Sequence, residues 1–147
     1  MAFELNKDPM NIQAEAIEIS SITVVVGDLL EVSSGAAESW TLCTSTSEWW
    51  TEKAVAIEAA TTSDSEVKAI LVHPLQLWTV ELANNSNTSH NNQRMILTDA
   101  NTVNNTGANS TTYAAIFRQH SAVGVVGDQR ATGYFMTGSG IDEPSAS

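Results

Sequence analysis

Residues 66–82 read EVKAILVHPLQLWTVEL, and this stretch holds the clearest strand pattern in the chain. From Glu66 to His73 the run is rich in aliphatic and β-branched residues, and Pro74 ends it, as is typical of a strand. From Leu77 to Leu82 large apolar residues alternate with residues that include Thr and Glu, which indicates one buried face. The stretch therefore predicts two consecutive strands separated at Pro74.

The same signs recur along the rest of the chain. Turn-forming clusters such as Gly27-Asp28, Thr61–Ser65 and Gly127-Asp128 separate short apolar or alternating runs. No convincing helix longer than two turns is present, and no repeat is visible. The other predicted strands are 21–26, 29–32, 39–45, 53–59, 93–98, 113–119, 122–126 and 131–136. Short strands at this spacing predict an all-β fold, a single small β-barrel or sandwich, over residues 20–137.

The two ends of the chain differ from this domain. Residues 1–19 carry spaced apolar side chains, and Pro9 interrupts any regular pattern. We interpret this segment as an extended N-terminal arm that docks on another protein; a frayed terminus or an arm packed on its own domain are the alternatives. Residues 138–147 are small and polar and predict a flexible C-terminal tail.

Asparagine is concentrated in one region. Residues 84–110 hold nine of the chain's eleven asparagines, divided by the predicted strand at 93–98. Asparagine tolerates left-handed backbone and caps its own turns. The region therefore predicts a pair of long Asn-rich loops, and loops of this length are usually functional or mobile.

Charge narrows the classes of partner. The 147 residues include six Lys and Arg against seventeen Asp and Glu, a formal net charge of −11. So few basic residues argue against nucleic-acid binding, and the acidic balance is repelled by anionic membranes. No signal peptide is visible, and no apolar run approaches the ~20 residues that cross a bilayer. Residues 1–70 hold twelve acids and three lysines, net −9, so the acidic character belongs to the N-terminal half.

The sequence offers little support for catalysis, metal binding or a cofactor. The single cysteine, Cys43, excludes an intrachain disulfide and lies in an alternating stretch typical of a small buried side chain. The three histidines, at positions 73, 90 and 120, lack the spacing that builds a metal site from one element. Carboxylates at Glu48 and Glu52 suggest a hydrolase only weakly, because sequence alone does not place two acids at a working distance.

The adjacent pair Trp49-Trp50 is the most informative aromatic feature. Neighbouring residues on a strand face opposite sides, so at most one ring lies in a given core. Three interpretations stay open for the other ring: partial cover by a loop, a protein–protein anchor, or a platform that stacks on sugars.

Four segments carry a resemblance to a known family. They are GDLL at 27–30, ILVHPLQLWTV at 70–80, QRMILTDANTVN at 93–104 and VGVVGD at 123–128. With this layout, residues 25–136 resemble the small head decoration (cement) proteins of tailed bacteriophages. The resemblance implies a β-barrel that binds the outside of an expanded capsid, and it transfers no catalytic residue.

These observations lead to one expected function with two rivals. We expect a structural protein, made in a host cytoplasm, that binds the outer capsid surface of a virion and stabilises it by bridging subunits of the major capsid protein, with the chain itself forming a homotrimer or other homo-oligomer. A carbohydrate-binding β-module on a virion or cell surface is the alternative, and a small hydrolase using Glu48 or Glu52 ranks below both. The expected contact residues are Phe3, Leu5, Met10 and Ile12 in the arm and Trp49 or Trp50 at a subunit interface.

Overall fold

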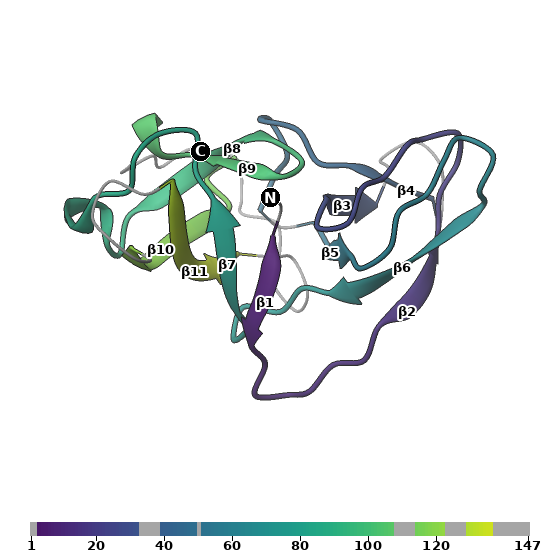
Figure 1. The fold of residues 1–147 in the computed structure, drawn as a ribbon, viewed down its shortest axis with the longest axis horizontal. Helices are drawn as coiled ribbons and strands as arrows, with labels where there is room; N and C mark the ends of the chain where they lie inside the picture. The colour runs from purple at the N-terminus through teal and green to yellow at the C-terminus, as the bar shows by residue number, and fades with distance from the viewer. Residues whose placement is uncertain (1–2, 33–38, 50, 108–113, 123–128, 137–147) are drawn as a thin grey trace, which may run out of the picture.

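The computed structural model describes residues 3–32, 39–49, 51–107, 114–122 and 129–136. Its strands form two antiparallel sheets that lie beside each other (Figure 1). The first sheet runs in the order β1 (Glu4–Lys7), β7 (Leu77–Glu81), β11 (Arg130–Phe135), β10 (Phe117–Ala122), β8 (Arg94–Asp99) and β9 (Thr102–Asn104). The second runs β2 (Glu15–Glu18), β6 (Glu66–Leu71), β5 (Lys53–Ala56), β3 (Leu29–Val32) and β4 (Trp40–Leu42).

The expected all-β class is confirmed. Two short 3-10 turns, η1 (Thr88–His90) and η2 (Asn105–Gly107), are the only helical elements in the described part of the chain. The described strands form no closed barrel. No helix among these residues is long and apolar enough to cross a membrane.

The described residues form two hydrophobic cores. The first core joins side chains of both sheets, with Trp78 and Phe135 from the first sheet and Val55 from the second. The second core lies within the second sheet and includes Ala54 and Ala56. Because successive side chains on a strand face opposite sides, β5 is buried on both of its faces.

Aromatic rings organise the first core. Phe135 makes edge-to-face contacts with Phe3, Phe117 and Trp78, at centroid distances of 5.0, 5.2 and 6.1 Å. This is the preferred geometry for aromatic pairs, and each such pair adds about 0.5–1.5 kcal/mol beyond the burial of its area. The cluster joins β10, β11 and β7 to the residue that precedes β1.

The segment predicted as an arm is paired along much of its described length. β1 pairs with β7, and β2 pairs with β6, so residues 3–19 contribute one outer strand to each sheet. Phe3 is only 2% exposed in the first core, and Ile17 and Ile19 fill the second. The structure agrees with the alternative in which this segment packs on its own domain, because its spaced apolar side chains match the inner faces of both sheets.

Two further predictions differ from the structure. Residues 21–26 form no strand; Val24 makes a single bridge to Ala60, and Ser21 has a positive φ of 54° that interrupts extended backbone. In the Asn-rich region, β9 pairs with β8 and buries Val103 completely. The buried Asn105 side chain exchanges hydrogen bonds with the backbone of Asn84, which joins the two ends of this region.

Other predictions lie outside the described residues. The predicted hairpin turn at Gly127-Asp128 and most of the strand predicted at 122–126 fall within residues 123–128. The predicted tail, residues 138–147, also falls outside them.

Gly133 on β11 gives the first testable prediction. A Cβ at this position would lie 2.2 Å from the backbone oxygen of Arg118 and 2.4 Å from Cζ of Phe117. We expect Gly133→Ala to lower the free energy of unfolding by about 1–3 kcal/mol or more, because β11 and the Phe117 ring must move apart. Urea unfolding measures this effect. The exposed Ser20→Ala is the control and should stay within about 0.5 kcal/mol of the wild type; an equally small effect at Gly133 would contradict the close approach.

Candidate functional site

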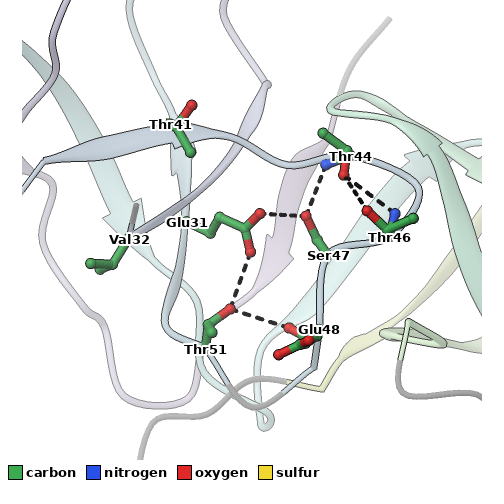
Figure 2. Close-up of a pocket in the computed structure, with 8 residues that line it drawn as sticks. All are labelled: Glu31, Val32, Thr41, Thr44, Thr46, Ser47, Glu48 and Thr51. Carbon is green, nitrogen blue, oxygen red and sulfur yellow. Dashed lines mark hydrogen bonds between the residues drawn. The ribbon is translucent and has the colours of Figure 1, made fainter. Parts of the chain in front are cut away.

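A polar pocket of about 270 Å³ lies where β3 and β4 meet the loop that follows them (Figure 2). This loop runs from Cys43 to Glu52 and contains the paired tryptophans. The pocket is lined by Glu31, Val32, Thr41, Thr44, Thr46, Ser47, Glu48 and Thr51. Seven of these eight side chains carry a hydroxyl or a carboxylate, so the pocket is the obvious candidate for a binding or catalytic site.

A tight turn over residues 44–47 forms one wall of the pocket. The Ser47 amide donates to the Thr44 carbonyl at 3.1 Å, and the Thr44 amide donates to Ser47 Oγ at 2.8 Å. The Thr44 and Thr46 hydroxyls bond each other at 3.1 Å. Threonine and serine favour such turns because their hydroxyls satisfy nearby backbone groups.

Glu31 on β3 joins the turn to the rest of the loop. Its carboxylate lies between Ser47 and Thr51 (Figure 2), accepting from Ser47 Oγ at 2.5 Å and from Thr51 Oγ1 at 3.2 Å. Hydrogen bonds to an ionised carboxylate are about twice as strong as those between neutral groups. The carboxylate therefore stabilises the loop on both sides of Glu48.

The ammonium group of Lys53 lies behind this network, 1% exposed at the start of β5. Its Nζ donates to the Glu48 carbonyl at 2.6 Å, to the Thr51 carbonyl at 2.9 Å and to Thr51 Oγ1. Glu31 Oε1 lies 3.6 Å from the same nitrogen. Burial lowers the pKa of Lys53, while the neighbouring Cys43 and Glu31 oppose that shift. All three N–H donors of the ammonium thus have a partner in this network.

Cys43 lies beside this ion pair, 2% exposed. Burial raises the pKa of its thiol strongly, and the negative charge of Glu31 raises it further. The thiol therefore stays protonated at neutral pH and is not a nucleophile. This agrees with its predicted place as a small buried side chain.

The polar groups of the pocket are hydrogen-bonded to one another. The Ser47 hydroxyl donates its only proton to Glu31, and the pocket lining contains no histidine that would act as a general base. Within the described residues, no group of three or more His, Cys, Asp or Glu is placed to hold a metal ion. This network of hydrogen bonds fixes the loop that carries Trp49.

The structure separates the residues predicted around the tryptophans. Trp49 is half-buried and packs against the first core, whereas Trp50 lies outside the described residues. Glu48 lines the pocket, but Glu52 is exposed and does not. The two acids are therefore not shown together in one cavity.

The four arm residues also separate. Phe3 is part of the first core, and Leu5 is partly buried against it. Met10 and Ile12 lie in a turn whose backbone amides donate to the Asp8 carboxylate at 2.9 and 2.8 Å. Burial raises the pKa of Asp8, but these hydrogen bonds outweigh it and lower the pKa below its usual value. Of the four apolar side chains, only Met10 is exposed, at 37%.

An exposed aliphatic patch, formed by Val25, Val26 and Ile57, was missed from the sequence. The three side chains are 50%, 58% and 42% exposed. Backbone hydrogen bonds from Val24 to Ala60 and from Gly27 to Ala56 flank the patch, so the two valines lie opposite residues 57–59. The sequence predicted a strand at 21–26 that ends at the Gly27-Asp28 turn, and it gave no sign that Val25 and Val26 are exposed.

The turn that presents the two valines is held firmly. Asp28 is 4% exposed, and its carboxylate accepts from the Val25 amide at 3.0 Å and from Asn101 Nδ2 at 3.1 Å. Gly27 has a φ of 91°, a conformation that favours glycine. The two valines therefore lie on a fixed turn, which lowers the entropic cost of ordering this segment when a partner binds.

Comparison with protein-family models, with curated proteins and with solved structures found no match for this chain. The resemblance to decoration proteins rests on four sequence segments, and three of them have a described place in the fold. Segment 27–30 forms the turn before β3 and its first two residues, 70–80 spans the end of β6 and most of β7, and 93–104 covers β8 and β9. These segments supply inner-face residues such as Trp78, Leu97 and Val103 to the first core.

Lys53 gives the prediction for this site. In Lys53→Met the carbonyls of Glu48 and Thr51 lose their donor, and Glu31 loses its counter-ion. We expect the free energy of unfolding, measured in urea, to fall by about 3–5 kcal/mol, as when one partner of a buried ion pair is removed. The matched control is Lys68→Met on an exposed position of β6, which should change stability by less than about 0.5 kcal/mol. Equal effects of the two substitutions would contradict the buried network.

Proposed function

We propose that this chain is a head decoration protein, which binds the outer surface of an expanded bacteriophage head and stabilises it by bridging major capsid protein subunits. The observation that carries the proposal is the exposed aliphatic patch on its firmly held turn. Exposed apolar side chains that cluster on a rigid support are a frequent mark of a protein–protein interface.

The energetics of such a contact suit a repetitive shell. Burying apolar surface contributes roughly 25 cal/mol per Å², so a patch of three aliphatic residues supplies a few kcal/mol at each site. Many copies on one lattice, and oligomerisation of the decoration protein itself, raise the overall strength by avidity. A protein that binds only the expanded shell then stabilises that shell by mass action.

Charge supports the outer surface as the place of binding. A net charge of −11 repels the packaged nucleic acid, which is itself strongly anionic. The exposed acidic residues of the edge strand β2, Glu15 and Glu18, also discourage edge-to-edge aggregation of free copies. In this proposal the N-terminal segment completes the domain, with Met10 as its exposed apolar contact and Trp49 or Trp50 at a subunit interface.

The patch provides a test on phage heads. Purified protein is added to undecorated expanded heads, and co-sedimentation and the melting temperature of the heads are measured. We expect the wild type to bind and to raise that temperature, and the Val25→Ser/Val26→Ser variant to bind at least tenfold more weakly with an unchanged melting temperature of its own. Both valines are exposed, so the fold does not depend on them.

Ala16→Ser, on the exposed edge strand β2, is the control variant and should bind like the wild type. A wild type that neither co-sediments nor stabilises heads would contradict the decoration function. A wild type that binds, together with a double-serine variant that binds equally well, would contradict only the role of the patch.

A carbohydrate-binding module is the second candidate, favoured by one observation. The half-buried Trp49 follows Glu48, which lines a pocket rich in hydroxyl groups, and protein sites that bind sugars combine aromatic rings with polar groups. This function predicts binding on a glycan array that is lost in Trp49→Ala and weakened at least tenfold in Glu48→Gln. Thermal melting of Trp49→Ala shows whether its loss is one of folding, and Glu48, being exposed, tests the pocket without disturbing the core. Absence of any glycan bound by the wild type would exclude this candidate.

A further inference from the structure

Basic residues gather on the outer face of the first sheet, although the chain as a whole is acidic. Strand pairing places Lys7 opposite Leu77, and Arg118 opposite both Tyr134 and Arg94. These residues form a row across β1, β7, β11, β10 and β8, which are adjacent in the order of the sheet (Figure 1). Three of the six Lys and Arg residues of the chain therefore share one row.

The row faces away from the first core. The residues next to it along each strand, Trp78, Met95, Phe117 and Phe135, are all buried in that core. Alternation along a strand then turns Leu77, Arg94, Arg118 and Tyr134 outward. The row is consequently a surface feature of the domain.

Arg94 and Arg118 lie opposite each other with like charges. Like charges directly opposite each other on neighbouring strands destabilise a sheet. Within the described part of the chain, no salt bridge joins Arg94, Arg118 or Lys7 to an acidic residue. Arg94 Nε and Nη2 donate hydrogen bonds to the carbonyl of Ala115, at 3.2 and 3.0 Å. The Arg118 guanidinium lies 5.9 Å from the centre of the Tyr134 ring. The charge at this pair is thus held in place without a neutralising partner.

Two hollows share Tyr134 in their linings, and together we call them the cationic groove. One, of about 590 Å³, is lined by Lys7, Asp8, Pro9, Leu75, Leu77, His120 and Tyr134. The other, of about 240 Å³, is lined by Pro74, Arg94, Arg118, Tyr134, Phe135 and Met136. Leu77 and Tyr134 separate Lys7 from the two arginines in the row, and Leu75, which lines the first hollow, is 61% exposed.

The groove lining holds one acid, Asp8, against the three cations Lys7, Arg94 and Arg118. The Asp8 carboxylate already accepts hydrogen bonds from the amides of Met10 and Ile12 and from Gln76 Nε2. It serves to close the turn after β1, because proline at the next position ends the strand. The groove therefore keeps a net positive charge.

We propose that the cationic groove binds an acidic segment of a partner polypeptide that carries aliphatic side chains between its carboxylates. Lys7 and Arg94 lie four strand spacings apart, about 19 Å at 4.8 Å per strand, which an extended segment of about six residues spans. Carboxylates at the ends pair with Lys7 and with the two arginines, and aliphatic residues in the middle cover Leu75, Leu77 and the Tyr134 ring. A single small anion would engage only the arginine pair and would leave the apolar part of the groove exposed.

The groove belongs to the first sheet, whereas the exposed aliphatic patch precedes β3 of the second, so this inference does not depend on the proposed decoration function. The test measures fluorescence polarisation of a labelled hexapeptide, DELLSE, titrated with the full chain. We expect Arg118→Gln to weaken binding at least tenfold, and Lys68→Gln, which removes the same charge from the second sheet, to change it less than twofold. The uncharged peptide NQLLSQ should bind at least tenfold more weakly than DELLSE.

Leu75→Ser is a second variant that leaves every charge in place, and it should weaken binding at least threefold. Thermal melting verifies that each variant folds.

Equal binding of DELLSE by Arg118→Gln and by the wild type would overturn the proposal. Displacement of DELLSE by inorganic phosphate at equal concentration would also overturn it, because it would indicate a site for a small anion. If DELLSE bound a chain that ends at Met136 but not the full chain, the occupant of the groove would be residues 137–147 and not a partner. If the wild type sedimented as a dimer and Arg118→Gln as a monomer, the occupant of the groove would be a second copy of the chain.

Discussion

Strand β5 is buried on both faces, and the arrangement of the other elements depends on this constraint. Val55 faces the core shared by the two sheets, whereas Ala54 and Ala56 face the core within the second sheet. A strand in this position needs small or aliphatic side chains on both sides, together with cover for each. The first sheet provides cover on one side, and residues 17–24 help to provide it on the other.

Lys53 begins the same strand, and its burial decides the shape of the adjoining loop. An ammonium group removed from water must find partners for its protons, and here the backbone carbonyls of Glu48 and Thr51 supply two of them. The loop therefore wraps around the charge, with Glu31 as counter-ion. The polar pocket, with Ser47 beside the Glu31 carboxylate, is the outer side of this network, which gives Trp49 a fixed position.

Charge is distributed differently over the two sheets. Acidic residues dominate the first half of the chain, which forms the second sheet and the outer strand β1 of the first. Three of the surface cations, Lys7, Arg94 and Arg118, lie on one face of the first sheet, beside partly exposed or exposed aliphatic residues. Under the two proposals made above, the cationic groove and the aliphatic patch would each bind a partner of different chemistry, and the two contacts together would fix its orientation.

The sequence by itself determined the all-β class and most strands, because alternation such as that from Leu77 to Leu82 reports burial directly. It also indicated the buried Cys43. Only the tertiary structure decided which strands are neighbours. Phe3 and Ile17 are core residues because β1 pairs with β7 and β2 pairs with β6. No local sequence pattern predicts which strand edge a distant segment will pair with. Arg94 and Arg118, 24 positions apart, became one charged pair through the register of β8 and β10. Local periodicity fixes which face of a strand is apolar, whereas contacts between distant segments arise only when the whole chain closes its cores.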